Sequence, residues 1–341
     1  MQELRYKPGL TRTRQLSIDF LPICLSGLAM GGLSADNPSM RTEMIRRLVA
    51  RHAPTDGAHD TPLEGIQLFR LTHPVERLPA VYSPSVCVVV QGSKRAYLGE
   101  AVHVYSPGQY LCATMPMPVQ AEASAASPEK PLLGLLVSLE TRAFTETVVE
   151  FETASVPLPQ GRSVEMVPGL AVVRWDNAFS SALQRMLELL EDPLALRVLG
   201  PGRLREFFFA ILLGEAGSSI RRTFGSSHGL SRAMSYLREN LDKSLSVNDL
   251  AQRAGMSRAV FDRRFREATT LSPLQFIKKL RLNEAAMQIA QGVHIGQAAG
   301  SVGYSSFSQF SREFRHHYGE APRAWGKLAR TRTTDTELSA L

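Results

Sequence analysis

The strongest constraint on the fold is a short motif that occurs twice near the C-terminal end of the chain. The first copy occupies residues 246–267 and the second occupies residues 294–317. In each copy a run with small apolar residues leads to a glycine, Gly255 or Gly303. Glycine adopts the positive φ of a tight interhelical turn at little cost, so each copy predicts two helices joined by such a turn.

The second half of each copy predicts a capped helix with one aromatic face. Ser257 and Ser305 follow the glycines by two positions, where a hydroxyl can accept a backbone N–H at the start of a helix. Aromatic residues then recur at spacings of three, four and seven, so we expect them to face the preceding helix. They are Phe261 and Phe265 in the first copy and Phe307, Phe310 and Phe314 in the second. This is the pattern of a helix-turn-helix, whose second helix enters the DNA major groove.

The segment between the copies, residues 272–292, predicts one long helix. Pro273 suits its first turn and Gly292 lies just past its end. A helix of about 19 residues spans roughly 28 Å. A spacer of that length suits two recognition helices separated by about one DNA turn, roughly 34 Å.

Charge is distributed unevenly along the chain. The whole chain carries a formal net charge of +7, whereas residues 228–330 contain 16 Lys and Arg against 8 Asp and Glu. A basic C-terminal domain joined to a nearly neutral one is typical of a protein that binds nucleic acid. A solvated basic face explains such a bias about as often when it stands alone, but the two turns in the same region favour nucleic-acid binding.

Residues 230–328 resemble the DNA-binding domain of the AraC/XylS family of transcription regulators. The most specific part is GYSSFSQFSREFRHHYGEAPRAW, residues 303–325. The chain departs from the family pattern at Gly296 and Gly300, where bulkier or more polar residues are usual. Each glycine within a helix costs up to about 1 kcal/mol relative to alanine, so we expect the second unit to be softer than the first.

The outward faces of the two recognition helices hold the candidate base contacts. They are Arg258, Ala259, Asp262, Arg263, Ser306, Ser308, Gln309 and Arg312. Arg263 is the best candidate because arginine binds guanine O6 and N7 bidentately, while Ala259 suits a thymine methyl group. Asp262 has two open roles, accepting from a cytosine amine or orienting a neighbouring arginine. The resemblance places Ala259, Arg263, Ser308 and Arg312 at base-contacting positions.

Five further basic residues are candidate phosphate contacts, which fix register without reading sequence, or else solvated charges. They are Arg266, Lys278, Lys279, Arg281 and Arg315.

The pattern between residues 65 and 140 is that of β-structure. Five or six short apolar runs are separated by turn residues, which favours a barrel or a sandwich. Residues 40–200 also resemble the cupin-like sensor domain of some AraC-type regulators, with PSVCVVVQGSKRAYLGE and SPGQYLCATMPMPVQAE carrying the resemblance. A small barrel can hold one small ligand.

No catalytic or metal-binding constellation is evident in the barrel region. His103 lacks nearby His and carboxylate partners, so we expect a strand residue and no metal or cofactor. Candidate pocket residues are polar or amphipathic, although an outward-facing strand residue is the favoured explanation for any single one. They are Gln91, Lys94, Arg95, Tyr97, Tyr105 and Tyr110. The three cysteines form no paired framework, which fits a reducing cytoplasm, and Cys87 and Cys112 are simplest as core residues.

Residues 142–224 predict helices with apolar stripes, including Phe179, Leu183, Met186 and Leu190. Their partner is the barrel or the same helices of a second subunit. The family resemblance implies that helices here can mediate a homodimer.

These patterns divide the chain into five segments. We expect a disordered extension at 1–39, a sensor and dimerisation domain at 40–220, a linker at 221–229, a DNA-binding domain at 230–329 and a disordered tail at 330–341. Residues 18–33 superficially resemble a secretory signal but are too short and interrupted to span a membrane. Met40 and Met44 are alternative starts.

The sequence therefore predicts an α+β protein: an N-terminal cupin-like β-barrel with flanking helices, then an all-α domain with two helix-turn-helix units. We expect a cytoplasmic, sequence-specific transcription activator that is not an enzyme. Its expected partners are double-stranded DNA, RNA polymerase, a small-molecule effector and a second subunit, with no membrane. Two alternatives stay open: an architectural protein that binds DNA without strong sequence preference, and a barrel enzyme tethered to DNA.

Overall fold

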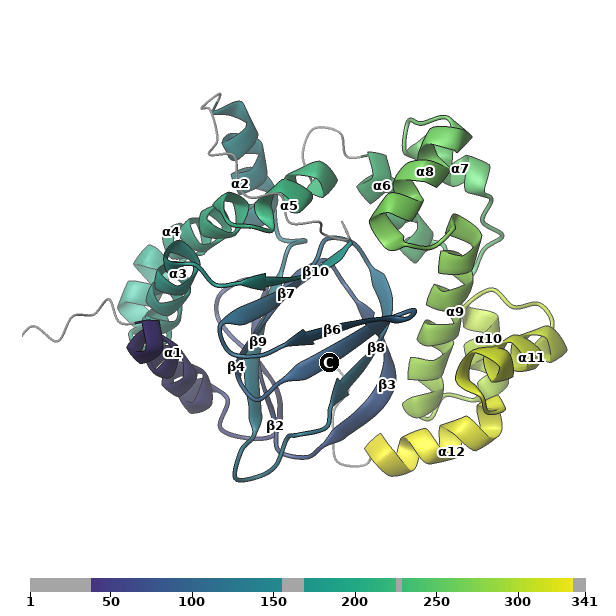
Figure 1. Ribbon diagram of the computed structural model, residues 1–341, viewed down its shortest axis with the longest axis horizontal. Coiled ribbons are helices and arrows are strands. Elements are labelled where there is room, and N and C mark those ends of the chain that lie inside the picture. The colour runs from purple at the N-terminus through teal and green to yellow at the C-terminus, as the bar shows by residue number, and fades with distance from the viewer. Residues whose placement is uncertain (1–37, 155–168, 225–228, 334–341) are drawn as a thin grey trace, which may run out of the picture. The chain divides into compact units, whose positions relative to one another are not determined.

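The computed structural model describes residues 38–154, 169–224 and 229–333 (Figure 1). The signal-like run at 18–33, residues 155–168 and 225–228, and the last eight residues lie outside these ranges. The first helix, α1 (Pro38–His52), begins two residues before the expected domain boundary. No described helix is both long enough and apolar enough to cross a membrane.

Ten described strands form two antiparallel sheets. They are β1 (Gly57–Asp60), β2 (Ile66–Leu71), β3 (Val75–Tyr82), β4 (Ser85–Gln91), β5 (Lys94–Leu98), β6 (Ala101–Tyr105), β7 (Gln109–Ala113), β8 (Met117–Ala123), β9 (Leu132–Ser138) and β10 (Leu170–Arg174). One sheet has the order β1-β2-β9-β4-β7-β10 and the other has the order β3-β8-β5-β6. Contacts of β6 with β7 and β10 bring the two sheets together as a cupin-like barrel, which confirms the expected fold class (Figure 1).

The structure contains more strands than the sequence patterns predicted. Residues 94–105 form a hairpin of β5 and β6, and Gly99 adopts φ +63° in the turn between them. Strand β3 contains Pro79, which removes a ladder donor, but β3 lies at the edge of its sheet, where proline is tolerated. Strand β10 interrupts the segment that was expected to be helical throughout.

Side-chain alternation divides the larger sheet between two cores. In β4, Cys87 and Val89 point into the barrel, whereas Val86 and Val88 belong to a second core under the helices. Because successive strand residues face opposite sides, a continuous apolar run such as SVCVVV serves both cores.

Helices cover the outer face of the larger sheet. They are α1, α2 (Arg142–Thr153), α3 (Asn177–Glu188), a 3-10 turn (Leu189–Glu191), α4 (Pro193–Leu213) and α5 (Gly217–Phe224). Three of the four residues of the predicted apolar stripe, Phe179, Leu183 and Met186, are buried in α3. The fourth, Leu190, lies in the 3-10 turn and is partly buried. The linker predicted at 221–229 was wrong at its start, because α5 continues to Phe224.

Seven helices make up the described part of the chain after residue 228. They are α6 (Gly229–Glu239), α7 (Val247–Arg253), α8 (Arg258–Thr269), α9 (Pro273–Ala290), α10 (Ile295–Ser301), α11 (Phe307–Tyr318) and α12 (Pro322–Thr333). The long central helix is confirmed as α9, with Ser272 as its N-cap and Gly292 at φ +92° beyond its end. The tail predicted from residue 330 was wrong at its start, because α12 runs to Thr333.

Candidate nucleic-acid interface

The first unit, α7 and α8, forms from short-range signals. Ser246 and Ser257 each accept a backbone N–H at the start of their helix, at 3.1 and 3.4 Å. Gly255 makes the turn with φ +65°. Phe261 and Phe265 are fully buried on the inner face of α8, as predicted. Packing thus fixes which side of α8 remains available to a partner.

The second unit, α10 and α11, repeats the design with one difference in its turn. Gly303 has φ +85°, and a Cβ added there would lie 2.7 Å from the carbonyl oxygen of Asp242. The prediction that Ser305 caps α11 was wrong. Ser306 is the N-cap, and its hydroxyl accepts the Gln309 N–H at 3.3 Å.

This difference changes the correspondence between the two recognition helices. The turn glycines Gly255 and Gly303 are 48 positions apart. The first buried phenylalanines of the two recognition helices, Phe261 and Phe310, are 49 positions apart. The second turn therefore contains one extra residue, and positions on α8 map to α11 with an offset of 49.

Phe307 lies at the first position of α11 and not in the core. The prediction of an inward side chain was wrong, since Phe307 is 56% exposed while Phe310 and Phe314 are fully buried. The helical spacing is correct, but α11 begins at this residue and Phe307 extends beyond the surface that α10 offers. With the offset of 49, Phe307 corresponds to Arg258 of the first unit.

The candidate base contacts of α8 lie together on its exposed side. Arg258, Ala259 and Arg263 are exposed, and the Arg263 side chain retains 69% of its accessible surface. Asp262 lies 3.7 Å from the Arg258 guanidinium, so the orienting role left open for it is the one the geometry fits. Arg263 has only a loose pairing with Glu267 at 3.9 Å, which leaves its guanidinium available.

The candidate base contacts of α11 differ in their availability. Ser308 and Arg312 are exposed, and Arg312 forms no ion pair with any described residue. The Ser306 hydroxyl is used in capping, and Gln309 donates to Glu313 at 3.2 Å. A shallow surface hollow runs along this face of the helix. It is lined by Phe307, Ser308, Ser311, Arg312, Arg315 and His316, with Gly319 and Ala321 at one end.

Two of the five candidate phosphate contacts are exposed and unpaired, and a third is in an ion pair. Arg266 and Arg315 are exposed on α8 and α11, and form no ion pair with another described residue. Lys278 lies 3.3 Å from Glu313 and so joins α9 to α11.

Lys279 and Arg281 lie close to other parts of the protein. The Lys279 ammonium lies near the β5–β6 turn at Gly99. Arg281 donates to the Lys243 carbonyl oxygen at 2.6 Å, and burial lowers its pKa. Arg281 is therefore better placed to support the fold than to contact phosphate.

A polar cluster around Glu313 of α11 was not predicted from the sequence. Glu313 accepts from the Tyr304 hydroxyl at 2.9 Å, from Gln309 and from Lys278. Burial acts to raise the pKa of Glu313, but these hydrogen bonds outweigh it and hold the pKa below its usual value. The cluster fixes the rotation of α11 about its axis. Its members come from three separate elements, and only the Gln309–Glu313 spacing of four gave a local signal.

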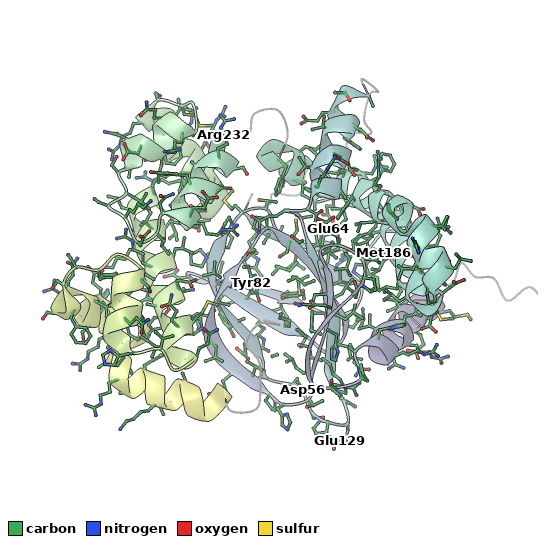
Figure 2. All side chains as sticks on the ribbon, turned by 180° about the vertical axis from the view of Figure 1, so that it is seen from behind. Asp56, Glu64, Tyr82, Glu129, Met186 and Arg232 are labelled. Atoms are coloured by element: carbon green, nitrogen blue, oxygen red, sulfur yellow. The ribbon has the colours of Figure 1, made fainter. Side chains whose placement is uncertain are left out.

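The barrel interior is a second candidate site. Lys94 and Tyr105 point inward and are buried, as two of the six pocket candidates should. A cavity of about 210 Å³ lies beside Lys94, with Tyr82 and Cys87 in its wall. Figure 2 shows Tyr82 on the barrel.

Of the six pocket candidates, Lys94 lines the cavity, and Tyr105 lies behind the wall, where its hydroxyl donates to Cys87 Sγ. The other four lie elsewhere. Gln91 donates to the Pro131 carbonyl oxygen, Arg95 and Tyr97 bind Glu122 on the outer surface, and Tyr110 stacks on Phe179 under the helices. His103 is half-buried on β6, and burial lowers its pKa. Cys87 and Cys112 are free and buried, in the inner and outer cores respectively. Among the described residues, no group of three or more His, Cys, Asp or Glu could hold a metal ion.

Two units of the helix-turn-helix type joined by one long helix, behind a cupin-like barrel, define a class of DNA-binding regulator. Residues 62–219 match the family model of the AraC-type transcriptional regulator N-terminus, and residues 250–327 match that of a helix-turn-helix domain. The chain belongs to the AraC/XylS family of transcription regulators.

Individual relatives match only part of the chain. The HTH-type transcriptional regulator ArgR of Pseudomonas aeruginosa is 32% identical over 106 residues, which cover 30% of this chain and 32% of ArgR. The raffinose operon transcriptional regulatory protein RafR of Pediococcus pentosaceus is 26% identical over 148 residues, covering 42% and 53%. The chain thus spans between a third and about half of these relatives. The crystal structure of ToxT from Vibrio cholerae is 11% identical with a TM-score of 0.49, covering 77% of this chain and 97% of ToxT.

Proposed function

We propose that this chain binds double-stranded DNA in a sequence-specific manner and regulates transcription. The main support is that Arg263 and Arg312 occupy equivalent positions, 49 residues apart, on the exposed faces of two separate recognition helices. Each is free to bind a guanine edge, and Ala259 and Ser308 are the equivalent neighbours one turn earlier. Two relatives that match part of the chain are named as transcriptional regulators.

Helix α9 gives the two readers their spacing. It has 18 residues, hence a length of about 27 Å, and its capping box and buried face make it a rigid connection. That length suits major-groove segments about one turn apart. Salt-dependent affinity comes from phosphate contacts, for which Arg266 and Arg315 are the best placed of the five candidates.

The proposal includes activation through RNA polymerase, in the cytoplasm where the DNA is accessible. A regulator that reads a site with two small helices has further surface with which to contact the polymerase. The barrel is the sensor, since its interior holds a cavity beside a buried polar cluster.

We further propose that the active form is a homodimer through α4. Large apolar residues remain exposed along one side of this helix, at spacings that keep them on one stripe. They are Leu194, Val198, Phe209 and Leu213. A stripe of this kind is common at subunit interfaces.

Selection of bound sequences from random duplex DNA, at a stated salt concentration, tests the proposal. We expect a recovered motif with two base-specific blocks about one helical turn apart. A single block means that one unit contacts only phosphate. Failure to enrich any sequence, while binding to bulk DNA persists, contradicts sequence-specific regulation and supports the architectural alternative.

A further inference from the structure

We propose that the barrel cavity binds a small, largely apolar ligand that carries one negative charge, such as a short-chain carboxylate, and that Lys94 is its counter-ion. This inference rests on the proposed effector control and names the chemical class of the effector. Three observations support it: the buried ammonium of Lys94, the Tyr82 hydroxyl without a well-formed hydrogen bond, and the apolar cavity that both groups line.

Lys94 is the first observation. It is the first residue of β5, is only 1% exposed and points into the barrel. Its ammonium lies 3.9 Å from Cys87 Sγ and 5.0 Å from the centre of the Phe69 ring. No described Asp or Glu forms an ion pair with it. Since a buried charge without an opposite charge is costly, the site is electrostatically incomplete.

The Tyr82 hydroxyl is the second observation. Tyr82 is 9% exposed, and its oxygen is buried without a well-formed hydrogen bond, although Tyr105 lies beside it. The Lys94 ammonium is 5.8 Å from the centre of the Tyr82 ring. Buried hydroxyls normally have a partner, so an acceptor is missing from the same region as the missing anion. One carboxylate supplies both.

The protonation states agree with this assignment. Burial acts to lower the pKa of Lys94, but Cys87 and Tyr82 outweigh it and the pKa lies above its ordinary value. Burial also raises the pKa of Tyr82. Both groups therefore keep their protons at neutral pH and act as donors, which selects an acceptor with negative charge.

The cavity defines the remainder of the ligand. Its volume is about 210 Å³, and away from Lys94 and Tyr82 its wall is mostly apolar, including Ala80, Leu111 and Met287. A cavity of about 150 Å³ holds benzene, so this one has room for roughly eight non-hydrogen atoms. With a single cation and an apolar wall, it suits a monoanion better than a phosphate ester.

The ligand would also touch the connection to the DNA-binding helices. Met287 of α9 lines the cavity, and Asn283, one turn earlier, donates to the carbonyl oxygens of Ala80 in β3 and Val119 in β8. Ala80 is itself part of the cavity wall. Occupancy therefore acts on the strand against which α9 is held.

Calorimetric titration of the full chain with three probes of equal chain length tests the proposal. Hexanoate has about eight non-hydrogen atoms, and hexanamide and hexan-1-ol are its neutral counterparts. We expect hexanoate to bind at least about tenfold more tightly than either neutral probe, since a hydrogen-bonded buried charge pair contributes at least that factor. Lys94→Met should abolish this preference while leaving hexan-1-ol binding unchanged.

Matched variants separate the ligand site from general damage. Arg95→Met, on the same strand but outside the barrel, should keep the preference. Should Lys94→Met fail to fold, Tyr82→Phe removes only the hydroxyl and should weaken hexanoate binding about tenfold. Absence of hexanoate binding at millimolar concentration, equal affinity for hexanoate and hexan-1-ol, or a preference that persists in a folded Lys94→Met protein would each overturn the proposal. Selection of bound DNA in the absence of ligand tests DNA recognition separately from ligand binding. If it recovers a two-block motif while one of these three outcomes is found, the proposed ligand is rejected but the proposed DNA recognition stands.

Discussion

Asn283 on α9 donates a hydrogen bond to the carbonyl oxygen of Val119 on β8, at 2.7 Å across 164 residues of sequence. The same amide nitrogen donates to the Ala80 carbonyl oxygen at 3.1 Å, and its oxygen accepts from the Tyr318 hydroxyl at 2.7 Å. This buried side chain therefore links the central helix, two barrel strands and the end of α11. It makes the contact of α9 with the barrel specific rather than merely apolar.

The first prediction concerns this link. Asn283→Asp replaces both donated hydrogen bonds by a carboxylate that faces two carbonyl oxygens. We expect a loss of about 2–3 kcal/mol in the free energy of unfolding in urea at neutral pH. Tyr318→Phe should cost about 1 kcal/mol, since it removes one hydrogen bond. Asn248→Asp, at an exposed site where the oxygen only accepts from Arg258, is the control and should have little effect. Equal stability of Asn283→Asp and the parent would refute the role given to Asn283.

The second prediction compares two glycines of the second unit. Gly300 lies within α10, and no atom lies within 4 Å of an added Cβ. Gly300→Ala should raise the free energy of unfolding by about 0.5–1 kcal/mol through helix propensity. Gly303→Ala should lower it by about 1–2 kcal/mol or more, because φ is +85° and the Cβ would meet Asp242. Thermal unfolding of both variants measures these two changes in stability. A shift of the unfolding temperature in the same direction for both variants would show that the turn is not as described.

Much of the DNA-binding part could be predicted because its signals are local. Turn glycines, caps and helical spacing of phenylalanines identify both units and the length of α9. The extra residue in the second turn could not be read in this way, since Ser305 and Ser306 are both competent caps and the choice depends on how α11 packs. The same shift leaves Phe307 exposed.

The barrel was less predictable because its key contacts join distant strands. Strand alternation does not say which face is the interior, so Lys94 and Tyr110 looked equally suited to a pocket. Only pairing of the sheets places Lys94 inside and Tyr110 against Phe179. β3 was obscured by Pro79, whose place on an edge strand is a property of the assembled sheet.

The third prediction follows from His317 on α11. Burial first, and then Lys279, His316 and Lys278, lower its pKa to about 4. An unfolded chain takes up this proton near pH 6.5, so the stability that a neutral His317 provides is present above that pH and is lost as the pH falls toward 4. The slope approaches about 1.4 kcal/mol per pH unit in this window. His317→Gln should remove that component in urea titrations between pH 4 and 7, whereas His316→Gln, which removes a cause smaller than burial, should keep most of it. An unchanged slope in His317→Gln would contradict the assignment.

The fourth prediction tests the proposed dimer. Val198 is 68% exposed on α4, and a glutamate there would place charge in the apolar stripe. We expect Val198→Glu to weaken self-association by at least about tenfold in sedimentation equilibrium. Val104→Glu on β6, where the valine is 49% exposed, is the matched control and should leave self-association unchanged. A parent protein that stays monomeric at micromolar concentration would rule out this interface.

The most direct test of two independent readers is selection from random duplex DNA with the parent protein, Arg263→Ala and Arg312→Ala in parallel. Each variant should lose about 1–3 kcal/mol at the parent site and lose preference in one block only, with a different block affected in each. Arg323→Ala, an exposed arginine on α12, should leave both blocks intact. Recovery of the full two-block motif by both Arg263→Ala and Arg312→Ala would contradict the account, because neither helix would then be reading the DNA through its arginine.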